Sequence, residues 1–267
     1  MADCFSMSEF EHELEKRAQE FIGSCTSKAG ASLLKMQSEA ANTNAVLPDL
    51  EEKAKKQEKI DFIKDCKRVL VLSSEEPWNT LSEISERLHL TTNRFQQCLK
   101  YLTIKGFVAR HKYPRSTKGG SPSVLEVTDG GRAFLKMFGI AYEPFHGRGG
   151  FDHTLGIKLV KMSFKDAVQI YTDQQVGDKA YDLTVVLKDR VIGVEVICSG
   201  APEHNTEALE RGAAQQGVAE LWAVFLEKEL KEKVRTILEA RGEIARKIQW
   251  KLIGDFFPKT ANTRSTS

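Results

Sequence analysis

Helical and strand periodicities alternate between residues 151 and 253, and their order limits the folds open to this chain. Apolar residues three or four apart predict helices, and short runs rich in Val and Ile predict strands. The predicted order is αβββαβαβ, at residues 151–162, 167–171, 181–187, 191–197, 205–217, 219–226, 228–240 and 248–253. Because helices separate the later strands, we expect a mixed sheet covered by helices, in the α+β or α/β class.

Two carboxylates occupy notable places in these predicted strands. Asp182 begins one strand, and Glu195 lies inside the apolar run VIGVEVI of the next. A lone carboxylate is costly to bury unless it is paired or bound to metal. Alternation places Glu195 on one face with Gly193 and Ile197, and that face can line a cleft. The alternative is that both acids are ordinary polar residues of strands.

The order αβββαβαβ with acids at these places resembles the restriction-endonuclease-like, or PD-(D/E)XK, nuclease fold. The resemblance implies that Asp182 and Glu195 hold Mg²⁺, or Mn²⁺, between neighbouring strands. It also implies Asp152, on the first helix, as a third metal ligand. Such an ion takes oxygen ligands and activates water beside a phosphate.

The chain departs from this family where a lysine is expected, because Ile197 stands there, and Tyr181 replaces the usual proline. Lys179 is the candidate for the missing catalytic lysine, and Gln215 on the following helix is the alternative. The lost lysine favours a nuclease-like domain that no longer cleaves. The clustered acids favour an active nuclease, and both hypotheses stay open.

Two polar residues at predicted helix starts have more than one interpretation. His153 is a base, a ligand, a helix cap or a residue that packs at a domain edge. Asn205 is a natural N-cap, and we assign it that role. The sequence contains no GxxxxGK[ST] phosphate loop, which argues against ATP hydrolysis, and no nucleophile elbow.

A second feature is the stretch 87–125, which contains no Asp and no Glu. The chain as a whole has 39 basic and 37 acidic side chains, so the excess of positive charge is local. Clustered Lys and Arg attract phosphate and are typical of nucleic-acid binding. The alternative is a solvated basic face on a domain that pairs with another protein.

The elements around this stretch have a recognisable order. Thr80 and Glu83 fit a capping box, a second helix is predicted at 93–106, and strands at 107–109 and 124–127 flank a basic turn. Pro48 and Asp49 are expected to start a helix that leads toward this stretch. With a first helix at 62–72, the order resembles a winged helix-turn-helix domain. The resemblance implies that the second helix of the turn enters the major groove and the wing lies along phosphates. The implied DNA contacts are Thr91, Thr92, Asn93, Arg94, Gln96, Gln97, Lys100, Lys112, Arg115 and Lys118.

The predicted organisation is a helical arm at 1–57, a winged helix at 58–143, a nuclease-like domain at 144–257 and a polar tail at 258–267. The arm either forms a homodimer or packs on its own chain. The five cysteines lack zinc-site spacing, and no signal peptide or membrane span is evident, so a cytoplasmic protein is expected.

Two classes of function follow. The first is a protein whose winged helix positions a nuclease-like domain on double-stranded DNA, an architecture that looks like proteins of mobile elements and their defence systems. The second is a non-catalytic transcriptional regulator or assembly factor whose nuclease-like domain binds DNA or a protein. A third hypothesis is that the basic domain recognises RNA or another protein.

Overall fold

The structure is a computed structural model that describes residues 47–117, 120–145, 147, 149–177 and 179–258. Most of the helical arm predicted at 1–57, expected to form a homodimer or to pack on its own chain, lies outside these ranges. The described residues fall into two compact units, one with 47–65 and 136–140 and the other with 66–135 and 141–258. No helix in the described ranges is both long and apolar enough to cross a membrane.

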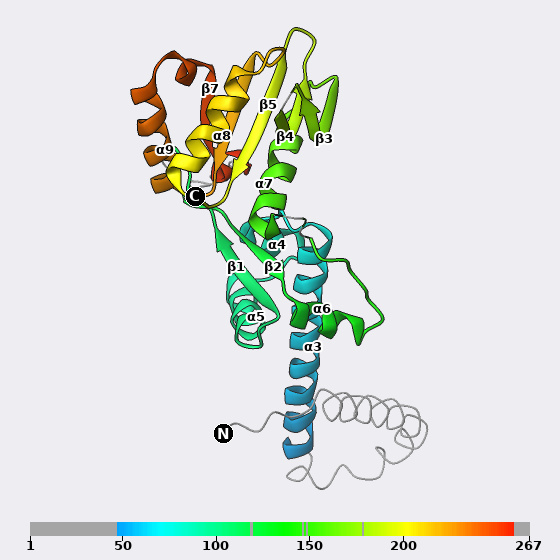
Figure 1. Cartoon of the computed structure of the whole chain (residues 1–267). Helices are drawn as coiled ribbons and strands as arrows, with labels where there is room; N and C mark the ends of the chain where they lie inside the picture. Colours follow the sequence, from blue (N-terminus) through cyan, green and yellow to red (C-terminus); the bar gives the residue numbers. More distant parts are fainter. Residues whose placement is uncertain (1–46, 118–119, 146, 148, 178, 259–267) are drawn as a thin grey trace, which may run out of the picture. The chain divides into compact units, whose positions relative to one another are not determined.

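The larger unit contains a five-stranded mixed sheet (Figure 1). The three strands β3, β4 and β5 are antiparallel neighbours, whereas β5, β6 and β7 run parallel. The predicted order αβββαβαβ and the mixed sheet are therefore confirmed. The strands are β3 (Gln169–Val176), β4 (Lys179–Val186), β5 (Val191–Ile197), β6 (Glu220–Phe225) and β7 (Ile248–Leu252).

Both faces of this sheet are covered. One buried cluster joins α7 (Gly150–Ser163) and the 3₁₀ turn η2 (Ile253–Phe256) to one face. A second cluster joins α8 (Pro202–Ala214) and α9 (Lys228–Arg241) to the other. Strands β5 and β6 supply both clusters by alternation, which is why these central strands are apolar along most of their length.

A helix pair and a hairpin precede the sheet, as the sequence predicts, and a further helix follows the hairpin. Thr80 caps α4 in a capping box with Glu83, whose carboxylate accepts the Thr80 N–H at 2.7 Å. Gly106, at a φ of +67°, follows α5 and turns the chain into β1. The elements are α4 (Leu81–Arg87), α5 (Thr92–Ile104), β1 (Val108–Lys112), β2 (Ser123–Val127) and α6 (Asp129–Lys136).

The helix before this group is longer than the predicted 62–72. Helix α3 runs without interruption over Leu47–Glu75. The added segment is rich in Glu and Lys, which are good helix formers, and Pro48 falls in the first turn, where proline is tolerated. The helix start expected at Pro48 and Asp49 is confirmed, and it is continuous with the predicted 62–72 in one helix.

Helix α8 begins earlier than predicted, and the capping role assigned to Asn205 is wrong. The helix starts at Pro202 after Ala201, and proline at this position is already set for a helix. Asn205 lies inside the first turn, where its side-chain amide donates to the Ser199 carbonyl at 3.2 Å.

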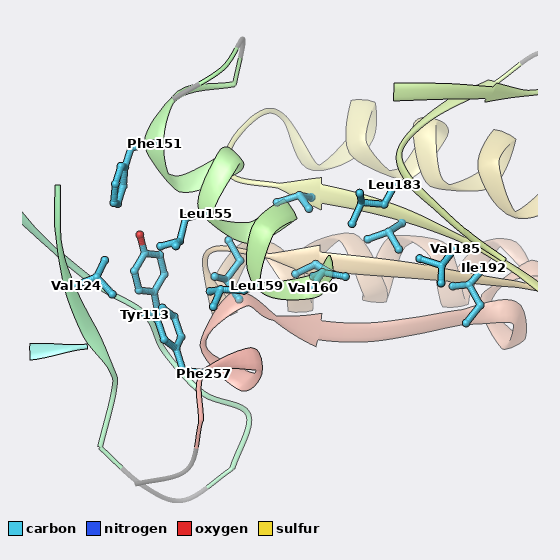
Figure 2. Close-up of a cluster of buried hydrophobic side chains, with 14 residues drawn as sticks. Tyr113, Val124, Phe151, Leu155, Leu159, Val160, Leu183, Val185, Ile192 and Phe257 are labelled. Atoms are coloured by element: carbon cyan, nitrogen blue, oxygen red, sulfur yellow. The ribbon is translucent and has the colours of Figure 1, made fainter. Parts of the chain in front are cut away.

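The β1–β2 hairpin and the sheet share one buried cluster (Figure 2). Tyr113, which follows β1, is fully buried against Phe257, with ring centroids 5.4 Å apart. Val124 of β2 belongs to the same cluster as Leu155 of α7. The hairpin is therefore fixed to the sheet by its apolar side chains.

Residue 254 sets how closely the hairpin approaches η2. A side chain on Gly254 would fall on the backbone carbonyl of Pro114 and close to that of Tyr113. Backbone atoms cannot move aside as a flexible side chain can. The close contact therefore requires glycine, because any side chain at this position would clash with the hairpin backbone.

We expect Gly254→Ala to lower the free energy of unfolding by about 1–3 kcal/mol, because the methyl group must push the hairpin away. Denaturant unfolding of the whole chain measures this. Gly120→Ala is the matched control, since a side chain there meets nothing within 4 Å. Equal stability of the two variants would contradict the close approach.

Candidate functional site

An open cleft of about 300 Å³ lies where β4 and β5 meet the start of α8 and the first turn of α7. Five ionisable residues line it: His153, Asp182, Glu195, Cys198 and His204. The first three come from α7, β4 and β5. The cleft therefore brings together the two predicted strand acids, Asp182 and Glu195, with His153 of α7, but it does not include Asp152.

The cleft exists because β4 and β5 separate at Asp182. Their pairing ends at Leu183 and Val194. Beyond this pair, the Val196 N–H donates to Asp182 Oδ2 at 2.7 Å, so a side chain replaces the backbone acceptor of the ladder. The strands consequently diverge while the amide stays satisfied.

Glu195 is the carboxylate of the cleft whose pKa is raised. Its side chain is 15% exposed, and burial raises its pKa from 4.5 to about 7, with the Asp182 charge acting in the same direction. The Lys179 ammonium opposes the shift from 2.8 Å. Glu195 Oε1 is enclosed, yet Lys179 does not meet it at hydrogen-bond angles. The pair is thus an ion contact with incomplete hydrogen bonding.

Asp182 is held by a second cation. His153 Nε2 lies 3.2 Å from Asp182 Oδ1, and this contact raises the pKa of His153. The charges of Asp173 and Glu195 act on His153 in the same direction. Below its raised pKa, His153 is thus a second cation, with Lys179, that faces these acids.

Asp173 is a member of this neighbourhood that sequence reasoning missed. It lies on β3 between the residues paired with Leu183 and Tyr181, and it has a φ of +52°. A non-glycine residue with positive φ is uncommon and often marks a functional site. Nothing in the sequence distinguishes this aspartate from other exposed acids.

Asp152 points to different partners from its neighbour His153. Its Oδ1 accepts the Tyr113 hydroxyl at 2.5 Å and lies 2.9 Å from His111 Nδ1. The other nitrogen of His111 lies 2.9 Å from Glu126 Oε2. Neutral imidazole has one N–H, so only imidazolium can donate to both carboxylates. These partners raise the pKa of His111, Asp152 contributing most.

Asp152 consequently lines a separate cleft, of about 320 Å³, with residues of β1 and of the β6–α9 connection. Side chains of successive helix residues point about 100° apart. Asp152 and His153 therefore line two different clefts. The sequence suggested one cluster of three acids. The structure brings Asp182 and Glu195 together and directs Asp152 elsewhere.

As placed, these residues do not fit a magnesium site. Asp182 is engaged by His153 and the Val196 N–H, Glu195 is engaged by Lys179, and Asp152 is bound by the hairpin. Within the described ranges, no group of three or more His, Cys, Asp or Glu side chains could hold a metal ion.

Three further residues have defined places. Ile197, at the position of the expected lysine, is buried among α8 and α9 side chains. Gln215 lies against Gly177 in the β3–β4 turn and does not line the cleft. Cys198 does line it, but burial raises the pKa of its thiol to about 12, so the thiol is protonated at neutral pH.

Helix α5 has one buried and one exposed face. Thr91 caps it by accepting the Arg94 N–H at 3.3 Å. The side chains that anchor the helix are Phe95, Cys98, Leu99 and Leu102. The exposed predicted contacts are Thr92, Asn93, Gln96, Gln97 and Lys100, whereas Arg94 is half-buried. The exposed set contains no acid.

Several cations of the acid-free stretch have partners from elsewhere in the chain. Arg87 forms a two-pronged ion pair with Glu76. The Arg115 guanidinium donates to the carbonyls of Gly254, Phe257 and Pro258, at 2.9–3.2 Å. Lys112 is exposed at the end of β1, and Lys118 lies outside the described residues. The basic field is therefore weaker at Arg87, where Glu76 offsets the charge, whereas Arg115 keeps its charge beside neutral carbonyls.

Comparison with known proteins assigns no family to the chain: no protein-family model matches it, and no curated protein matches it. Its function must therefore be inferred from the cleft and from the exposed face of α5.

Glu195→Gln should become more stable relative to wild type as pH rises from 5 to 8. The folded pKa of about 7 exceeds the ordinary 4.5, so wild type loses stability as pH rises through this window. The cost at pH 8 is on the order of 1–3 kcal/mol, reduced by the loss of the Lys179 contact.

Denaturant unfolding at several pH values measures this difference. Glu227→Gln, which neutralises an exposed carboxylate, is the control and should show little pH-dependent difference from wild type. A difference between Glu195→Gln and wild type that stays constant with pH would contradict the raised pKa.

Proposed function

We propose that this chain is a DNA-binding protein that contacts duplex DNA through the exposed face of α5. In this proposal, residues 58–143 act as a winged helix-turn-helix. The restriction-endonuclease-like sheet domain serves recognition or assembly and does not cleave DNA. The proposal includes the predicted cytoplasmic location.

The observation that carries the proposal is the composition of the exposed α5 face. Asn93, Gln96 and Gln97 offer amide groups that can pair with base edges, and Lys100 offers a charge to phosphate. The opposite face of α5 is fixed in the core, so these side chains are held on a rigid element. An acid-free exposed face on a helix followed by a hairpin supports entry into a groove.

The cleft supports the non-catalytic part of the proposal. The acids that would hold a metal ion face Lys179 and His153, and the third expected ligand is engaged by the hairpin. One observation favours the nuclease alternative. Lys179 Nζ lies 2.8 Å from Glu195 Oε1, so its ammonium could take the place of the lysine that Ile197 replaces. A direct assay is needed to separate the two.

Lys100→Ala should weaken binding to a random-sequence DNA duplex and reduce the salt dependence by about one phosphate contact. Fluorescence anisotropy over a salt series measures both quantities. Lys161→Ala is the matched control, because Lys161 is an exposed lysine on α7. Equal effects of the two variants would count against α5 as the DNA contact, and preference for duplex RNA would favour RNA recognition.

We expect no DNA cleavage by the purified protein with Mg²⁺ or Mn²⁺ above the level of Glu195→Ala. Supercoiled, linear and single-stranded DNA should all be tested. Cutting by wild type that vanishes in Glu195→Ala would overturn the non-catalytic proposal and make Lys179 the functional lysine of the site.

A further inference from the structure

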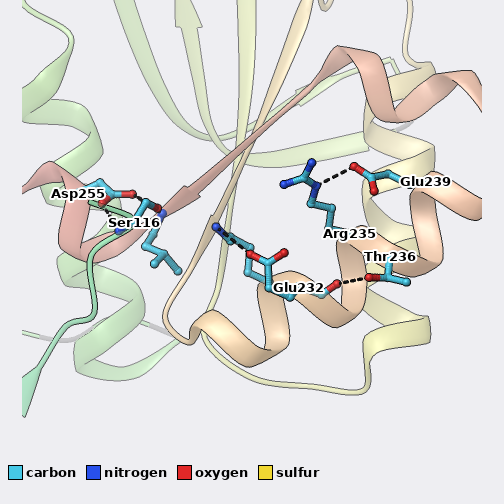
Figure 3. A network of polar contacts seen from close by, with 8 residues as sticks. Ser116, Glu232, Arg235, Thr236, Glu239 and Asp255 are labelled. Carbon is cyan, nitrogen blue, oxygen red and sulfur yellow. Dashed lines mark hydrogen bonds and ion pairs between the residues drawn. The ribbon is translucent and has the colours of Figure 1, made fainter. Parts of the chain in front are cut away.

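The tip of the β1–β2 hairpin binds a carboxylate of its own chain. The Ser116 N–H donates to Asp255 Oδ1 and the Ser116 hydroxyl donates to Asp255 Oδ2, both at 2.7 Å (Figure 3). A single residue thus binds both oxygens of one carboxylate. Ser116 is exposed, so this contact lies at the surface and not in the core.

Arg115 adds positive charge beside this carboxylate. Its three hydrogen bonds go to the carbonyls of Gly254, Phe257 and Pro258, which are neutral acceptors on either side of Asp255. The segment 254–258 therefore presents to the hairpin tip one anion surrounded by carbonyl oxygens. A backbone N–H, a hydroxyl and a guanidinium are also the groups that bind DNA phosphates.

We propose that Asp255 occupies a phosphate-binding site at the hairpin tip and competes there with the DNA backbone. This inference rests on the proposed DNA binding by α5 and adds a self-inhibiting contact to it. The two non-bridging oxygens of a phosphate replace the two carboxylate oxygens on Ser116, and Arg115 turns from carbonyl oxygens to a full negative charge.

Release can be confined to the tip. Tyr113 is buried in the cluster shared with the sheet, and Pro114 is in close contact with Gly254. Arg115 and Ser116 follow these anchors, and their contacts with 254–258 are polar and half-buried or exposed. The base of the hairpin therefore stays in place while the tip exchanges one anion for another.

The test is duplex affinity of the full chain carrying Asp255→Asn, measured by anisotropy with a random-sequence DNA. Removing the competing charge should tighten binding about threefold to tenfold, the range of one charge-assisted hydrogen bond beyond a neutral one. Asp166→Asn removes the same charge from an exposed site elsewhere and controls for the change in net charge.

Asp255 also accepts the Leu252 N–H at 3.1 Å, so its replacement can loosen η2. A second variant separates this effect from the proposal. Ser116→Ala added to Asp255→Asn should remove most of the gain, because it deletes a donor to the phosphate. A gain that survives in the double variant would place the phosphate elsewhere and overturn the inference.

The same binding measurements separate competition by Asp255 from DNA contact by α5. If Lys100→Ala weakens binding but Asp255→Asn does not exceed Asp166→Asn, the α5 contact stands and the competition is wrong. If neither wild type nor Asp255→Asn binds duplex DNA, both are wrong. Binding that appears only in Asp255→Asn would support both.

Discussion

The hydrogen bond from the Val196 N–H to the Asp182 carboxylate determines how the cleft between β4 and β5 forms. It satisfies a β5 amide without a neighbouring strand, so β4 and β5 can part without leaving a buried donor unpaired. The Glu195 side chain, which belongs to the otherwise apolar β5, lies in this gap. The cations of Lys179 and His153 then offset part of the cost of enclosing two acids.

The order of elements could be predicted because periodicity, caps and glycine breaks are local. Gly106 ended α5 as expected, and alternation along β5 placed Glu195 on a face with Gly193 and Ile197. The boundaries were less certain where local signals competed. Pro202 started α8 three residues before Asn205, and the charged start of α3 carried no apolar pattern.

The partners of the site residues could not be predicted, because they join distant parts of the chain. The acids Asp152 and Asp182 looked equivalent as metal ligands in the sequence. Only the packing of the hairpin against α7 shows that Tyr113 and His111 contact Asp152. The same holds for the acid-free stretch. Arg115, for example, donates to the carbonyl of Gly254, a residue far away in the sequence.

The contacts of Arg115 and Ser116 also bear on folding kinetics. They join residues 139 apart in the chain. The antiparallel neighbours β3, β4 and β5 follow one another directly, whereas β6 and β7 need helical crossovers. Contacts between distant residues carry the larger loop-closure cost. The hairpin tip should therefore close after the sheet has formed and open before it melts, so its amides would exchange with solvent through a local opening.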